Sequence, residues 1–460
     1  MIVVSHRGPF AFTRDPNGTF SARRGAGGVV SALGPLLLED DAHTGAWVAA
    51  AIGPDDRAAV EAGQATAEGI DLRYLVFDHH THHLAYDMIA NGVLWFLHHG
   101  LFDHVSAPVF DPELHEAWDA FVAMNAAFAE ATLDAADDHD GPVLIQDYQL
   151  SLVPGMIRAR RPDLEVTHFT HTPFCGPNSI RVLPDAWGRA LCESLASVPC
   201  GFHVPRWRNA FEASVRTVLG ADTELQTFTA PLGPDSSALT NDARAEAVDL
   251  EIDRLLARVG DRALIIRTDR MEPSKNIVRG FLAYEQLLHD HPEWRERVVF
   301  VAMLYRSRQT LPVYVRYAGD VAATAQRINQ RFGTEDWTPI VIDDRDDVQR
   351  SFAGLRAYDV LVTNPLKDGM NLVAKEGPIL NDRDGVLCLS PEAGAWDELH
   401  SDAVAMHPYD VVSASHALLT ALTMTSEERA ARATGLRAAA SANGPASWIS
   451  AQLAAARRRD

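Results

Sequence analysis

Short apolar runs, many of them β-branched, alternate along the chain with longer stretches in which apolar residues recur at helical spacing. Continuous apolar runs are typical of strands covered on both faces, as in parallel sheets. Helices between such strands indicate a doubly wound α/β arrangement. The expected strands are 2–5, 72–77, 143–146, 166–171, 264–267, 298–303, 340–342, 360–363 and 386–389, and the clearest expected helices are 114–136, 205–219, 243–259 and 278–289.

The length of 460 residues suits two domains rather than one core. The segment PLGPDSSALTND at 231–242 is rich in Pro, Gly, Ser and Asp and predicts the boundary. We therefore expect Rossmann-like domains at 1–235 and 236–445, facing each other across a central cleft that holds the ligands. Residues 446–460 predict a terminal helix that crosses back to the first domain.

Composition narrows the class of protein. The chain is 47% hydrophobic and 22% charged, as in a soluble globular protein. The 41 basic against 62 acidic residues give a charge of −21, which argues against a nucleic-acid partner. Four cysteines without a CxxC pair predict free thiols in a reducing compartment: Cys175, Cys192, Cys200 and Cys388. With neither a signal-peptide pattern nor an apolar run of about 20 residues, we expect a cytoplasmic protein without a membrane partner.

The most informative segment is NPLKDGMNLVAKEG at 364–377, which follows an expected strand and leads into a helix. Backbone N–H groups at a helix start suit a diphosphate. The groups in question belong to Met370, Asn371 and Leu372. Glu376 comes about two turns later and could accept both hydroxyls of a ribose. The alternative is that Asp368 caps the helix and Glu376 is a surface acid.

Two further loops carry candidate phosphate-binding groups. RTDRMEPSKN at 267–276 places Arg270 and Lys275 after a strand, where both cations could stabilise a departing diphosphate without a metal; ordinary surface charge is the alternative. Near the N-terminus, Arg7 follows the first strand, and RRGAGGVV offers glycines that let a backbone approach a phosphate. Taken alone, that glycine pattern often marks only a turn.

The string DGMNLVAKE resembles the signature of glycosyltransferase family 20, whose main members are trehalose-6-phosphate synthases. The spacing from Asp368 to Glu376 is similar to the acidic pair of retaining GT-B transferases. Further matches follow in order over nearly the whole chain: SHR at 5–7, AGG at 26–28, Tyr86 and Trp95 in YDMIANGVLW, Asp147 in QDYQL, His171 in HTPF, DRMEPSK at 269–275, Arg308 in YRSR, WTP at 337–339 and HPYD at 407–410.

The resemblance implies a GT-B fold, a nucleotide diphosphate glucose donor and roles for individual residues. Catalytic roles would fall to Arg270 and Lys275 on the donor diphosphate, Asp368 on the glucose hydroxyls and His171 near the 6-hydroxyl. Glu376 would bind the ribose, and the remaining residues would contact either the donor or the acceptor. The backbone of Gly27, Gly28, Met370, Asn371 and Leu372 would assist with the donor, while Asp147 would lie beside the acceptor hydroxyls and Arg7, Tyr86, Trp95 and Arg308 around the acceptor phosphate.

Each of these residues also has a plainer interpretation. Tyr86 and Trp95 could be core aromatics, His171 a satisfied buried histidine and Asp147 a cap. The family's reaction retains the anomeric configuration and is described as front-face attack, in which the leaving phosphate accepts the acceptor's proton. No strong side-chain base is then needed, and the protein orients the substrates and stabilises the diphosphate. Neither a cofactor nor a metal is expected.

Several positions depart from the family pattern. His6 stands where asparagine is common, Gln146 and Gln149 replace both histidines of HDYHL, and HTPFC replaces HIPFP. Gln349 aligns with an expected phosphate-contacting arginine, although Arg345 and Arg350 are near in sequence. These departures lie mainly on the acceptor and leaving-group side, so they weaken the assignment of the acceptor more than that of the fold or the donor.

Relatives with other acceptors share some of these features. HTPF and CGFHVPR at 200–206 are similar to glucosylglycerol-phosphate synthases, and DYQL with RVLP at 181–184 to pseudo-glycosyltransferases. Glycerol 3-phosphate and a cyclitol phosphate therefore stay open as acceptors, although the intact DGMNLVAKE speaks against a pseudo-glycosyltransferase.

Other classes of function are weaker. A catalytically silent regulatory subunit would be free to lose donor residues, which are all present, and nothing marks the cofactor-bearing lysine of a phosphorylase. The histidines of FDHHTHHLAYD (His79, His80, His82 and His83) lack the carboxylate framework of a metal site and are expected to be solvated. The nucleotide base stays open, and a homo-oligomer is expected only by analogy.

Overall fold

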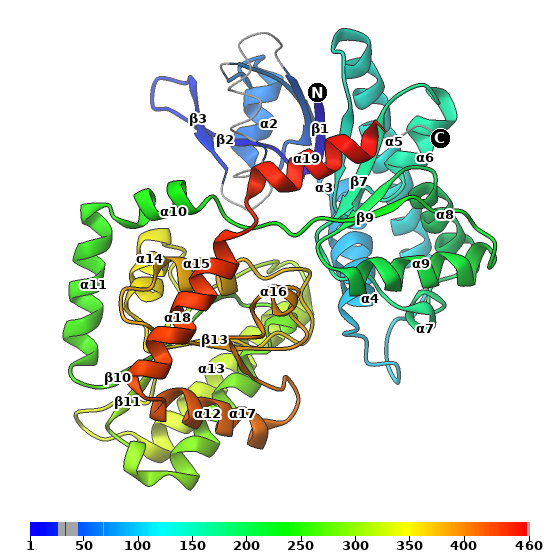
Figure 1. Cartoon of the computed structure of the whole chain (residues 1–460). Helices are drawn as coiled ribbons and strands as arrows, with labels where there is room; N and C mark the ends of the chain where they lie inside the picture. Colours follow the sequence, from blue (N-terminus) through cyan, green and yellow to red (C-terminus); the bar gives the residue numbers. More distant parts are fainter. Residues whose placement is uncertain (26–32, 34–44, 68, 458–460) are drawn as a thin grey trace. The chain divides into compact units, whose positions relative to one another are not determined.

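The computed structural model describes residues 1–25, 33, 45–67 and 69–457. The chain forms two compact units, Met1–Pro231 with Pro445–Asp460, and Leu232–Gly444 (Figure 1). Each unit is built around its own parallel sheet, of seven and six strands respectively. The predicted α/β class with two parallel sheets is therefore confirmed.

The first unit has the strand order β5-β4-β1-β6-β7-β8-β9, with all neighbours parallel. The sequence predicts β1, β5, β6 and β7 but not β4, β8 or β9. The alanine-rich GAWVAA of β4 has weak strand propensity, and β8 and β9 have three residues each. The bounds are β1 Ile2–Arg7, β4 Gly45–Ala50, β5 Ile70–Leu75, β6 Val143–Gln146, β7 Val166–Thr170, β8 Cys200–Phe202 and β9 Thr227–Thr229.

Helices cover this sheet. α5 (Pro112–Asp138) packs on β1 and β4 and on the π-helix η1 (His83–Leu94), and the Asp111 carboxylate caps α5 by accepting from the Leu114 N–H at 2.9 Å. The terminal helix α19 (Pro445–Ala456) packs on β6 and β7. The remaining elements of this unit are the hairpin β2 Phe10–Arg14 and β3 Phe20–Arg24, α2 Pro54–Glu61, α3 His79–His82, α4 Trp95–His99, η2 Tyr148–Leu150, α6 Val153–Arg160, α7 Pro177–Ile180, α8 Asp185–Ala196 and α9 Pro205–Leu219.

The second unit has the strand order β12-β11-β10-β13-β14-β15, again all parallel. The strands are β10 Ala263–Arg270, β11 Val298–Tyr305, β12 Ile340–Asp343, β13 Val360–Thr363, β14 Val386–Leu389 and β15 Val404–Ala405. The helices are α10 Ser236–Ala243, α11 Glu246–Val259, η3 Pro273–Lys275, α12 Ile277–Asp290, η4 Pro292–Trp294, α13 Pro312–Phe332, α14 Val348–Ala357, α15 Val373–Leu380, α16 Trp396–Leu399, α17 Val411–Thr423 and α18 Ser426–Ser441.

The pairing of β10 with β13 positions the candidate site of this unit. These strands are parallel neighbours in register at Ile265 and Val360, so their carboxyl ends meet at one edge of the sheet. The loops that follow them, 271–276 and 364–372, carry the two strongest sequence motifs. β13 and the middle of β10 are buried beneath these loops, so the loops stand on a packed core.

The cysteines and the length of the apolar helices bear on two further expectations. All four cysteines are buried and free, as the sequence predicts. Within the described ranges, no helix combines the length and apolar character that crossing a membrane requires.

Candidate active site

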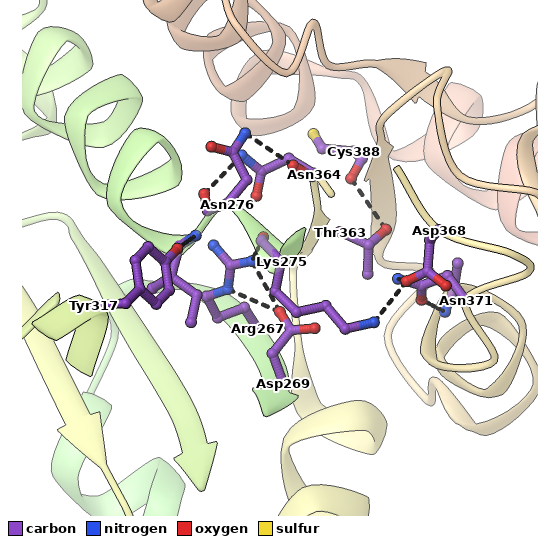
Figure 2. A network of polar contacts seen from close by, with 12 residues as sticks. Arg267, Asp269, Lys275, Asn276, Tyr317, Thr363, Asn364, Asp368, Asn371 and Cys388 are labelled. Carbon is purple, nitrogen blue, oxygen red and sulfur yellow. Dashed lines mark hydrogen bonds and ion pairs between the residues drawn. The ribbon is translucent and has the colours of Figure 1, made fainter. Parts of the chain in front are cut away.

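A short turn fixes the backbone that carries Lys275. β10 ends at Arg270, and η3 follows as a 3₁₀ turn that ends at Lys275. The fully buried Arg267 donates to the Asp269 carboxylate at 2.8 Å and to the Lys275 carbonyl at 2.8 Å (Figure 2). The Asn276 amide donates to the Asn364 carbonyl at 3.1 Å, which ties this turn to the end of β13. The backbone at Lys275 is therefore fixed by a bond from Arg267 and by the neighbouring bond from Asn276 to the end of β13.

Lys275 and Asp368 face each other across these two loops. The Lys275 Nζ lies 2.5 Å from the Asp368 Oδ2, and their side chains are 16% and 17% exposed (Figure 2). Burial lowers the pKa of Lys275, but the carboxylates of Asp368 and Asp269 outweigh this effect and raise it, so the lysine stays charged. A partly exposed ion pair of this kind can exchange its protein partner for a ligand phosphate or hydroxyl.

The start of α15 is capped by Asn371 and not by Asp368. The Asn371 Oδ1 accepts from the Ala374 N–H at 3.0 Å, while its amide nitrogen donates to Asp368 at 3.2 Å. The alternative in which Asp368 serves only as a cap is therefore wrong. In the part of the chain that the structure describes, the N–H groups of Met370, Asn371 and Leu372 donate to no other residue. These donors are thus available to a ligand beside the Asp368 carboxylate.

A close approach of two backbones holds this loop. The Gly394 N–H donates to the Asp368 carbonyl at 3.1 Å, and the Ala395 N–H to the Met370 carbonyl at 2.7 Å. A Cβ atom on Gly394 would lie 2.0 Å from the Gly369 carbonyl oxygen, so only glycine permits this packing.

A buried carboxylate that the sequence analysis missed joins two of the predicted cations. The Glu272 Oε1 lies 3.2 Å from Arg270 and 3.8 Å from Arg308, and it accepts from the Ser307 hydroxyl at 3.1 Å. Burial alone would raise the pKa of Glu272, but the charges of Arg270 and Arg308 hold it at about 2. Arg308 also donates to the Tyr314 hydroxyl at 2.6 Å. The only sequence signal for this arrangement is an acid two residues after Arg270.

Glu376 lies on α15, one helical turn beyond Asn371, and is partly buried. Burial raises the pKa of its carboxyl to about 7. The interpretation of Glu376 as an ordinary surface acid does not fit this environment. A carboxylate with few competing partners is suited to accept ligand hydroxyls.

Replacing Glu376 with glutamine is expected to remove part of the pH dependence of stability. The native pKa of about 7 lies above the ordinary value of 4.5, so the folded state keeps the proton where the unfolded state releases it. The free energy of unfolding should therefore fall as the pH rises through this interval. The Tm of Glu376→Gln minus the Tm of the parent should therefore be about 2 to 4 °C larger at about pH 8 than at about pH 5. An equal Tm difference at both pH values would show that Glu376 titrates normally.

In the first unit, His171 is joined to Asp147. The backbone N–H of His171 donates to the Asp147 Oδ1 at 3.1 Å, and Asp147 has a positive φ of 73° just after β6. Strained backbone of this kind is common where a side chain must be aimed. The His171 ring is bonded at both nitrogens, to Gln146 at 3.1 Å and to His203 at 3.2 Å. Burial lowers the pKa of His171 to about 3, so the ring is neutral at physiological pH.

The other predicted acceptor residues of this unit differ in their exposure and in their contacts. Arg7 is exposed at the end of β1. The preceding His6 is buried and stacks on Tyr86, with ring centroids 4.0 Å apart and planes at 6°. Trp95 is only 3% exposed, and its ring centroid lies 4.2 Å from that of His99. Gly27 and Gly28 lie outside the described residues.

The two arginines near Gln349 in the sequence are both paired with carboxylates. Gln349 and Arg345 are exposed, and Arg345 contacts Asp343 at 3.3 Å. Arg350 is paired with both Asp343 and Glu251. Among the residues with described positions, no group of three or more metal-ligating side chains, including those of the histidine-rich segment, could hold an ion.

Comparisons with known proteins agree over the whole chain. The family model described as Glycosyltransferase family 20 matches residues 1–458. A trehalose-6-phosphate synthase from Mycobacterium ulcerans is 31% identical over 95% of this chain and 89% of its own length. A bifunctional trehalose-6-phosphate synthase/phosphatase from Thermoproteus tenax is also 31% identical over 94% of this chain, which spans 60% of that relative's length.

A solved structure shows the same architecture. The structure from E. coli bound with UDP-2-fluoro glucose has a TM-score of 0.85 and 26% identity, and the match covers 100% of this chain and 99% of the other. The GT-B fold expected from the sequence is therefore confirmed.

Proposed function

Since the chain belongs to glycosyltransferase family 20, we propose that it is a retaining transferase that moves glucose from a nucleotide diphosphate glucose to glucose 6-phosphate, giving α,α-trehalose 6-phosphate. The observation that carries this proposal is the grouping of Arg270, Lys275 and Asp368 after β10 and β13. Beside them lie backbone N–H groups, those of residues 370–372, that donate to no other described residue. Cations and N–H donors suit a diphosphate, and a carboxylate beside them suits sugar hydroxyls.

In the proposed reaction the bond between the glucose C1 and the diphosphate oxygen breaks, and a bond forms between C1 and the acceptor oxygen on the same face. The acceptor's proton passes to the departing phosphate oxygen, so no side-chain base is required. Arg270 and Lys275 stabilise the negative charge that develops on the diphosphate. Lys275 exchanges part of its contact with Asp368 for this phosphate, and Asp368 then accepts from the glucose hydroxyls.

His171 serves in this proposal as a neutral group. Its low pKa rules out a positive charge near neutral pH, so it orients the donor sugar by contact and does not protonate it. Glu376 accepts from the donor ribose, and Arg7, Tyr86, Trp95, Asp147 and Arg308 serve the acceptor, as the family resemblance implies. The UDP sugar bound in the E. coli relative supports UDP-glucose as the first donor to test.

A second acceptor class is supported by a specific observation. Gln146, Gln149 and His6 replace the residues that are common in the family, and His6 is packed against Tyr86 of the proposed acceptor pocket. Glycerol 3-phosphate or a cyclitol phosphate could then replace glucose 6-phosphate on the same donor machinery. A catalytically silent subunit remains the alternative of a different class.

The test is nucleotide release by the purified chain with UDP-, GDP- or ADP-glucose and with glucose 6-phosphate, glycerol 3-phosphate or no acceptor. We expect release that depends on glucose 6-phosphate and an α,α-linked disaccharide phosphate by mass spectrometry and NMR. Release only with another acceptor would overturn the product but not the donor chemistry. Binding of donor without release under any condition would point to a silent subunit.

A further inference from the structure

A buried chain of polar side chains runs from the terminal helix to His171. The Gln146 Nε2, at the end of β6, donates to the Gln452 Oε1 on α19 at 2.9 Å. The Gln146 Oε1 lies 3.1 Å from the His171 Nε2, and the His171 Nδ1 lies 3.2 Å from the His203 Nε2. Gln452 and Gln146 are fully buried, so water does not compete for these bonds.

The donors and acceptors of this chain determine where the His171 proton lies. Because the amide nitrogen of Gln146 is directed to Gln452, its carbonyl oxygen faces His171, and an amide oxygen can only accept. With the two amides oriented in this way, the His171 Nε2 carries the hydrogen. The Nδ1 of the neutral ring then has only a lone pair, which accepts from the His203 Nε2–H.

We propose that Gln452, acting through Gln146, is a positioning residue that fixes the orientation and the Nε2–H tautomer of His171. The terminal helix would then take part in preparing the site, although its residues are remote in sequence from β6 and β7. The expected effect on turnover rests on the proposed function, in which His171 contacts the donor sugar. The expected effect on the His171 tautomer does not depend on the proposed function.

The packing of α19 gives Gln452 a fixed position. The Trp448 ring meets the Phe169 ring edge-on, with centroids 5.2 Å apart at 84°, and lies 5.4 Å from the His171 ring. Trp448 is completely buried. One helix thus supplies both an apolar wall beside the imidazole and the acceptor that aligns Gln146.

The same chemistry explains how glutamine can stand where the family commonly has histidine. A neutral imidazole and a primary amide each offer a donor and an acceptor, so either can accept from His171 and donate to Gln452. Gln146→His should therefore preserve the direction of the bonds, whereas Gln146→Met should abolish them at similar side-chain volume.

The experiment uses the full chain with ¹⁵N-labelled histidine and reads the imidazole tautomer by NMR, the His171 signals being identified by their loss in His171→Asn. We expect the Nε2–H form in the parent and in Gln146→His. In Gln452→Met and Gln146→Met we expect both tautomers, with kcat lowered about tenfold and the KM for the donor changed less. Ile449→Ala, a packing change on the same buried helix, should lower Tm but leave the tautomer unchanged.

A parent protein with the hydrogen on the His171 Nδ1 would overturn the proposal, and so would an unchanged tautomer in Gln452→Met. A loss of the tautomer in Ile449→Ala equal to that in Gln452→Met would also overturn it, because packing and not the amide would then be responsible. If no donor and acceptor pair gives turnover, the proposed function fails, while the NMR signals still decide this inference.

Discussion

Replacing Lys275 with alanine is expected to lower kcat for nucleotide release by about 100- to 1,000-fold, the cost of losing one preorganised charge at a departing anion. The Nζ lies at the Asp368 carboxylate, on a turn that Arg267 and Asn276 hold in place. In the proposed reaction it can therefore meet the diphosphate without rearrangement of the backbone. Because this charge matters most when the bond to the diphosphate breaks, kcat should fall more than the donor KM rises.

A matched cation provides the control for this prediction. Arg345 lies near Gln349 in the sequence, is exposed, and contacts only Asp343 in the described part of the chain. Arg345→Ala should leave kcat within about twofold, as for other exposed ion pairs. Steady-state rates of nucleotide release measure both variants. A Lys275→Ala enzyme that keeps kcat within about threefold would show that the lysine serves only to neutralise Asp368.

The parts of the fold that the sequence predicts well are those whose information is local. Apolar runs such as VVFVAM in β11 and VLVT in β13 predict buried strands. The loops after β10 and β13 contain recognisable sequence motifs. β4 is missed because GAWVAA owes its strand conformation to parallel pairing with β1 and β5 on both sides. Tertiary pairing of this kind leaves little trace in the segment itself.

The same distinction applies to the site. Arg270, Lys275 and Asp368 follow from loop motifs, and the structure brings the last two into contact. The alternative in which Asp368 caps α15 rests on residue type alone, whereas the structure shows Asn371, with a positive φ of 76°, accepting from the Ala374 N–H at the helix start. Gln452 is unpredictable from the sequence, because it meets Gln146 across 306 residues and nothing in its own helix indicates that contact.

Replacing Glu272 with glutamine is expected to lower the free energy of unfolding at neutral pH by about 3 kcal/mol. The carboxylate is 1% exposed and serves as the shared counter-ion of Arg270 and Arg308, which glutamine would leave close together without compensation. Because its native pKa of about 2 lies below the ordinary value of 4.5, this stabilisation is present above about pH 4.5 and disappears as the pH falls towards 2. The difference in Tm between parent and variant should therefore shrink on acidification.

Glu285 is a matched control for this effect, since it is also shared by two arginines, Arg327 and Arg331, but the side chains of those arginines are about half exposed. Glu285→Gln should cost about 1 kcal/mol or less and leave turnover unchanged. Glu272→Gln should in addition raise the KM of both substrates, because Arg270 serves the donor and Arg308 the acceptor in the proposed reaction. Thermal unfolding at neutral and acid pH separates the causes: a Tm penalty for Glu272→Gln that is equal at both pH values would mean that packing, and not charge, holds the two arginines.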